Sequence, residues 1–81
     1  MNFSYQIESF RKDTEEGLEY QEVGQLDDAF VMRLVGASLE EGFGGALLAP
    51  EQAELLVAHT GLPLEFDFKA NIHYLAPYRA S

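Results

Sequence analysis

The sequence predicts an α+β fold in the order β-β-α-α-β, with a three-stranded antiparallel sheet and two helices packed on one face of it. Three observations favour this fold: a hairpin pattern near the N-terminus, two helical stretches bounded by Gly and Pro, and an alternating stretch near the C-terminus. A chain of 81 residues is expected to form one small acidic domain, residues 1–81, around one hydrophobic core.

The alternating stretch, residues 64–74, is the element around which the rest of the chain is organised. Apolar and polar residues alternate along it without interruption, which is typical of a strand with one buried and one solvated face. We expect its aromatic face to pack against the helices and the opposite face of the sheet to be open to solvent. That open face would carry polar side chains from all three strands, namely Gln6, Glu8, Glu19, Gln21, Glu65, Asp67, Lys69, Asn71 and His73.

The N-terminal part of the chain reads as a β-hairpin. Residues 3–7 alternate as a first strand would, and Phe10 breaks the alternation, which predicts a bulge or a strand end there. Residues 12–17 contain Asp, Thr and Gly, which suit a turn. Residues 18–23 then return as the second strand. We expect a loop of about four or five residues, because the sequence has no two-residue turn of the Asn-Gly type.

Two helices are expected next. The first begins near Asp27 or Asp28, whose carboxylates suit the positive end of a helix. It ends at Gly36, or alternatively continues through residues 37–41.

The second helix has clearer boundaries. Pro50 suits the first helical position, where its missing N–H is no loss. Gly61 is expected to cap the C-terminus, and Pro63 prevents the helix from continuing.

The composition excludes several classes of protein. There is no cysteine, which excludes disulfides and thiolate metal sites. No apolar run approaches the roughly 18 residues that a membrane helix needs, and residues 1–5 lack the pattern of a signal peptide. We therefore expect a cytoplasmic protein that does not bind membranes.

The net charge is −9, from 14 acidic and 5 basic residues. This charge disfavours binding to nucleic acid, which needs Lys and Arg to replace the counterions of phosphates, and to anionic membranes. It favours a basic protein partner reached by electrostatic steering, although acidity can also serve solubility alone. The acids are concentrated in residues 8–28, where eight of them against Arg11 and Lys12 give a local net charge of −6.

The histidines and the paired acids are the candidates for chemistry. His59 falls in the last turn of the second helix, where capping of the helix C-terminus is favoured over catalysis. His73 and Asp67 are expected on one face of the last strand but roughly 20 Å apart, too far to share a metal ion. Adjacent acids such as Glu15 and Glu16 are expected to be exposed, and no nucleophile motif is present. The sequence thus predicts no catalytic, cofactor-binding or metal-binding residue, and we do not expect an enzyme.

Parts of the chain resemble a family of small, uncharacterised bacterial proteins. Residues 49–53 (Ala-Pro-Glu-Gln-Ala), continuing through residues 61–67 (Gly-Leu-Pro-Leu-Glu-Phe-Asp), look like the C-terminal half of that family. The turn Phe10-x-x-Asp13-x-x-x-Gly17 is similar too. Such proteins resemble the immunity proteins of polymorphic and contact-dependent growth-inhibition toxin systems. The resemblance implies a cytoplasmic antidote that blocks the active site of a toxin, and it carries over no functional residue, because the matching positions are structural.

We therefore predict an immunity protein that neutralises a cognate toxin with a basic surface, such as a nuclease, and that is a monomer or weak homodimer when free. One alternative is an adaptor or regulatory module that interacts or dimerises through a sheet edge; another is a small enzyme or metal-dependent hydrolase. Phe43, in the glycine-rich residues 42–45, either packs into the core or contacts the partner. The expected partner-binding residues are Glu8, Glu15, Glu16, Glu19, Glu22, Asp27, Asp28, Phe43, Glu65 and Asp67.

Overall fold

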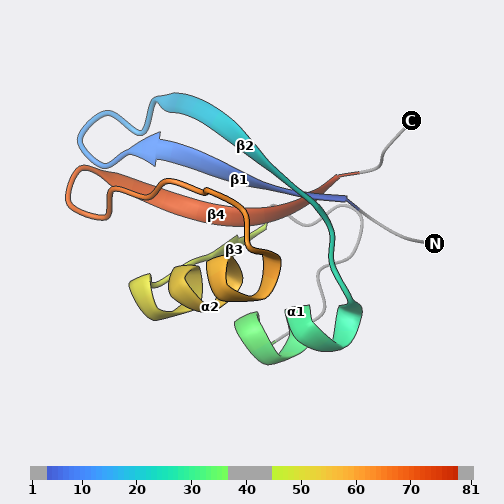
Figure 1. The fold of residues 1–81 in the computed structure, drawn as a ribbon. Coiled ribbons are helices and arrows are strands. Elements are labelled where there is room, and N and C mark those ends of the chain that lie inside the picture. Colours follow the sequence, from blue (N-terminus) through green and yellow to red (C-terminus); the bar gives the residue numbers. More distant parts are fainter. Residues whose placement is uncertain (1–3, 37–44, 79–81) are drawn as a thin grey trace.

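The chain forms a four-stranded antiparallel sheet with two helices on one of its faces (Figure 1). The computed structural model describes residues 4–36 and 45–78, so Phe43 lies outside the described residues. The strands lie in the order β2-β1-β4-β3, and the predicted α+β class is confirmed. The elements in chain order are β1 (Ser4–Arg11), β2 (Gly17–Gln25), α1 (Asp28–Val35), β3 (Ala46–Leu47), α2 (Pro50–Thr60) and β4 (Asn71–Tyr78).

The prediction of three strands was wrong by one, because β3 is only two residues long. It pairs Ala46 with Leu75 and Leu47 with Tyr74, along the edge of β4. A strand of two residues shows no alternation in the sequence, so the pattern that identified the other strands could not reveal it.

The predicted hairpin of β1 and β2 is present, with five residues between the two strands. The register shifts between Ser9 and Phe10, as predicted, and a second time near the start of β1. Both shifts place the extra residue on β2, since β1 pairs with β4 without interruption along its whole length. β1 therefore keeps a strict alternation, which puts Phe10 on the opposite face from Tyr5 and Ile7.

Both helices begin and end where the sequence indicated. α1 starts at Asp28 and ends at Val35, and Gly36 closes it in the left-handed conformation, with φ of 75°. The first helix therefore takes the shorter of the two predicted lengths. α2 starts at Pro50, and Gly61 closes it in the same way, with φ of 70°. No helix within residues 4–36 and 45–78 is long and apolar enough to cross a membrane.

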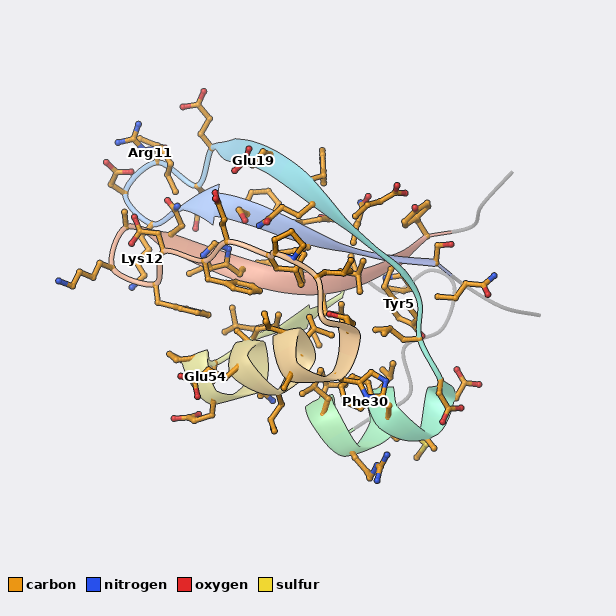
Figure 2. The ribbon with its side chains drawn as sticks, viewed as in Figure 1. Tyr5, Arg11, Lys12, Glu19, Phe30 and Glu54 are labelled. Atoms are coloured by element: carbon orange, nitrogen blue, oxygen red, sulfur yellow. The ribbon has the colours of Figure 1, made fainter. Side chains whose placement is uncertain are left out.

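Two contacts join the helices to each other. The Gln52 side chain accepts a hydrogen bond from the Ala49 N–H at 2.7 Å and donates one to the carbonyl oxygen of Leu34 at 2.8 Å. The rings of Phe30 on α1 and His59 on α2 stack with centroids 3.7 Å apart and planes within 10°. His59 lies in the last turn of α2, as predicted, and Figure 2 shows Phe30 directed toward that helix.

The long alternating stretch is not a single strand, so that prediction was wrong. Residues 61–67 lie outside the sheet, residues 68–70 form a turn, and β4 begins only at Asn71. The Asp67 carboxylate stabilises the turn by accepting hydrogen bonds from the backbone N–H groups two and three residues ahead, at 3.2 and 3.4 Å. The alternation before the turn instead reflects packing of one side against the core, by Leu62, Leu64 and Phe66.

The turn also reverses which side chains of β4 face the helices. Ile7 pairs with Leu75 and Ser9 with His73, so these four side chains share the face covered by the helices, here called the inner face. His73, which we expected on the solvated face, is only 2% exposed. Glu19 and Gln21, the β2 partners of Ser9 and Ile7, also lie on the inner face, contrary to prediction. The other face, here called the outer face, carries Gln6, Glu8, Phe10, Tyr20, Ile72 and Tyr74.

The core lies between the inner face and the helices. Tyr5 and Ile7 of β1, Leu75 of β4 and Leu56 of α2 are at most 1% exposed. Burying each such side chain stabilises the fold by about 1.5–3 kcal/mol. Burial also raises the pKa of the Tyr5 hydroxyl, and the negative charge of Asp28 raises it further. Figure 2 shows Tyr5 pointing from the sheet toward the helices.

Candidate functional site

A buried pair of polar side chains, Ser9 and His73, connects the two central strands. Ser9 Oγ lies 2.7 Å from Nδ1 of His73. The other ring nitrogen, Nε2, accepts a hydrogen bond from the backbone N–H of Asp67 at 3.0 Å. A neutral imidazole carries hydrogen on only one nitrogen, so the proton lies on Nδ1 and is donated to the serine oxygen.

This geometry suits a structural pair better than a catalytic one. Ser9 and His73 are 4% and 2% exposed, and the rings of Phe66 and Phe68 cover the imidazole edge-on at centroid distances of 5.1 and 5.0 Å. Burial lowers the pKa of His73, while Asp67 acts in the opposite direction. A nucleophilic serine must give its proton to the histidine, and here the histidine donates to the serine.

The expected separation of Asp67 and His73 was wrong. An extended strand would hold them roughly 20 Å apart, but the turn at residues 68–70 folds Asp67 back onto β4, 3.0 Å from the ring at its backbone nitrogen. Even so, within the described ranges no three or more acids and histidines are close enough together to hold a metal ion.

Three of the predicted partner-binding residues, Glu19, Glu65 and Asp67, line one hollow of about 420 Å³, here called the acidic hollow. Gln21 explains how they meet. Its amide donates to the carbonyl oxygen of Glu65 at 2.6 Å and accepts from the N–H of Glu65 at 2.7 Å. These two hydrogen bonds tie the extended segment to β2 and so bring Glu65 beside Glu19. The hollow is completed by Ser9, Phe66, Asn71 and His73.

A second hollow of about 430 Å³, here called the aromatic hollow, opens on the outer face and includes two further predicted residues, Glu8 and Glu15. Its walls include the rings of Phe10 and Tyr74, with centroids 5.8 Å apart and planes at 81°. These aromatic residues were not among the expected partner-binding residues, although strict alternation along β1 from Ile7 places Phe10 on the outer face. The other described lining residues are Gly45 and Ile72.

The remaining predicted residues lie elsewhere on the surface. Glu16 is exposed in the hairpin loop, and Asp27 and Asp28 are exposed at the start of α1. Glu22 accepts a hydrogen bond from the hydroxyl of Tyr78, and this bond raises the pKa of the Tyr78 hydroxyl. The predicted residues that the structure describes are therefore divided between two hollows and separate exposed positions, and these residues do not form one site.

The negative charge of this surface is largely uncompensated. Among the described residues, the one ion pair joins Arg11 Nε to Asp13 Oδ1 at 3.4 Å, and both side chains are exposed. Lys12 is held by the neighbouring turn, since its Nζ donates to the carbonyl oxygen of Phe68 at 2.6 Å. In Figure 2 both bases lie at the loop end of the hairpin, whereas Glu54 lies on the helical layer. Such a surface attracts positively charged groups.

No protein-family model, curated protein or solved structure matches this chain.

Proposed function

We propose that this chain is a cytoplasmic immunity protein that binds a cognate bacterial toxin domain and blocks its active site. The observation that supports the proposal most directly is a set of exposed carboxylates that form no ion pair within residues 4–36 and 45–78. Glu19, Glu65 and Asp67 gather around the acidic hollow, and the whole chain carries a net charge of −9.

A basic substrate cleft is the surface that such a protein would fit. A nuclease binds phosphates with Lys and Arg, and carboxylates that approach the same cleft compete for those side chains. Electrostatic attraction between the acidic surface of this chain and the basic cleft accelerates association, and this attraction weakens with increasing salt. Rapid association suits an antidote that must act before the toxin reaches its substrate.

Co-expression with the toxin domain encoded beside this gene tests the proposal. We expect cells that carry the toxin alone to stop growing and cells that carry both proteins to survive. The variant Glu19→Gln/Glu65→Gln/Asp67→Asn should protect less well, and Asn at position 67 keeps a side-chain oxygen for the turn. Survival of cells that lack this protein would overturn the proposal.

The matched control is Asp13→Asn/Glu51→Gln/Glu54→Gln, which removes the same charge from exposed acids outside the expected partner-binding residues. Full protection by this control, together with loss of protection by the first variant, would locate the contact at the acidic hollow. Equal loss in both would show that net charge alone supports binding.

A second candidate function, an adaptor that pairs through a sheet edge, is supported by the shortness of β3. β4 spans eight residues, but β3 pairs with only Tyr74 and Leu75. Within the described ranges, much of this edge of β4 therefore has no strand partner, and open edges favour pairing with another chain. Light scattering after size-exclusion chromatography distinguishes the cases: a stable dimer favours edge pairing between copies, and a monomer at all concentrations contradicts it.

A further inference from the structure

The outer face of the sheet carries an aromatic cluster that the helices do not cover. Both helices lie against the inner face (Figure 1). Phe10, Ile72 and Tyr74 are half-buried on the outer face, and Tyr20 is 68% exposed. A sheet face that meets water is ordinarily polar, and an apolar patch with a polar rim marks a binding surface.

The aromatic hollow lies within this cluster and has a definite shape. The rings of Phe10 and Tyr74 stand nearly perpendicular, at 81°, and form two walls. Ile72 adds an aliphatic surface, and Glu8 and Glu15 supply two carboxylates. The volume of about 430 Å³ exceeds what one long side chain needs.

Hydrogen bonds hold the Glu8 carboxylate and the Glu15 backbone in place beside the walls. Glu8 is the register partner of Tyr74, and its Oε2 accepts a hydrogen bond from Gln6 Nε2 at 3.0 Å. Its other oxygen has no hydrogen-bond donor among the residues that the structure describes. Glu15 has a φ of 58°, and its N–H donates to the carbonyl oxygen of Arg11 at 2.8 Å, which fixes the loop around it.

We propose that the aromatic hollow binds an arginine side chain presented by the protein partner. A guanidinium is planar, stacks on aromatic rings, and donates several hydrogen bonds to carboxylates at once. Its aliphatic stem would lie along Ile72. A phosphate-bearing ligand would be repelled by the two carboxylates, and buried arginines are frequent energetic centres of protein interfaces. The identity of the partner rests on the proposed function above, but the test of this site does not require the toxin.

The test is an NMR titration of the ¹⁵N-labelled protein with the capped peptide Gly-Arg-Gly. The control peptide contains citrulline, which has nearly the same shape as arginine and no charge. We expect the arginine peptide to shift the backbone signals of Phe10, Ile72 and Tyr74 in a saturable manner, a lysine peptide to bind more weakly, and the citrulline peptide not to bind.

Charge variants with equal net charge identify the site. Glu8→Gln/Glu15→Gln should lower the affinity by about two- to fivefold for each carboxylate removed. Glu51→Gln/Glu54→Gln, on α2 and hence on the other side of the sheet, should leave it unchanged. The spectra of the free variants show whether they fold, and if Glu8→Gln does not, Glu15→Gln in the exposed loop serves alone.

Three results would overturn this site: equal binding of the citrulline peptide, equal loss in the two double variants, or shifts that are absent or confined to the acidic hollow. If these occurred while the chain still protected cells against the toxin, the arginine site would be refuted and the proposed function would remain. If the arginine peptide bound as expected and the chain did not protect cells against the toxin, the proposed function would be refuted and the arginine site would remain.

Discussion

His73 and Ser9 face each other across β4 and β1, and a hydrogen bond of 2.7 Å joins their side chains inside the core. Because the other ring nitrogen accepts the Asp67 N–H, one imidazole ring holds together two strands and the extended segment that precedes β4. The distance between Ser9 and His73 would suit a catalytic dyad, but their burial and hydrogen bonds are better explained by a structural role.

The free energy of unfolding should decrease when the pH falls below 6.5, the usual pKa of histidine. Burial lowers the pKa of His73 in the folded protein below its usual value of 6.5. Between 6.5 and the lowered pKa, the unfolded chain binds a proton that the folded chain does not, so acid favours unfolding by up to about 1.4 kcal/mol per pH unit. Above 6.5 this loss is absent.

Urea unfolding midpoints measured between pH 5 and pH 8 check this expectation. A His73→Gln variant should be less stable at neutral pH but should lack the part of the decline below pH 6.5 that His73 causes. A His59→Gln variant serves as the control, because His59 is exposed, and it should keep the decline. An unchanged pH profile in His73→Gln would contradict the assignment.

Removing the serine hydroxyl should destabilise the protein without exposing new surface. Ser9→Ala leaves the Nδ1–H of the buried His73 without an acceptor, and an unsatisfied buried donor costs about 1–3 kcal/mol. Thr14→Ala, in the exposed hairpin loop, should change stability much less. A double-mutant cycle of Ser9→Ala with His73→Phe isolates the pair, and a coupling energy near zero would show that the hydrogen bond contributes nothing.

Removing the Gln21 side chain should release the extended segment locally. Gln21→Ala deletes both hydrogen bonds to the Glu65 backbone. These groups are exposed, so we expect a global loss of only about 1 kcal/mol, together with faster hydrogen exchange at the Glu65 amide. The amide of Ile7, in the centre of the sheet, should keep its protection in this variant. Unchanged hydrogen exchange at the Glu65 amide would mean that the extended segment is held by its packing and not by the two Gln21 hydrogen bonds.

The sequence predicted those parts of the fold that depend on local signals. Pro50 and Gly61 bound α2, and Gly36 ends α1, because each meets a backbone requirement that is met within a few residues. The hairpin was predictable for the same reason. The boundary of β4 was not, because an alternating pattern reports one-sided packing and does not distinguish a sheet strand from an extended segment laid on a core.

The wrong start predicted for β4 also led to wrong positions for side chains of the candidate site. Once the turn formed by Asp67 interrupts the stretch, every later side chain changes face, so His73 enters the core and Tyr74 joins the outer face. The acidic hollow was only partly predictable. Glu19, Glu65 and Asp67 were identified from charge, but their meeting depends on the Gln21 hydrogen bonds, a long-range contact that no local pattern reveals.

Gly45 and Gly61 provide a matched pair that tests how β3 is attached to the sheet. Both have positive φ, of 99° and 70°, so an alanine at either position adopts the left-handed conformation at a cost of roughly 1–2 kcal/mol. A Cβ at Gly61 meets nothing within 4 Å, whereas a Cβ at Gly45 would lie 2.9 Å from the carbonyl oxygen of Leu75 and 3.2 Å from Ala76 Cα.

Those atoms belong to the backbone of the buried strand β4, which cannot shift as a flexible side chain can. Gly45→Ala should therefore destabilise the protein by at least about 1 kcal/mol more than Gly61→Ala, since overpacking adds to the conformational cost. Denaturant unfolding of the two variants measures the difference directly. Equal losses would mean that β3 shifts away from β4 at little cost in stability.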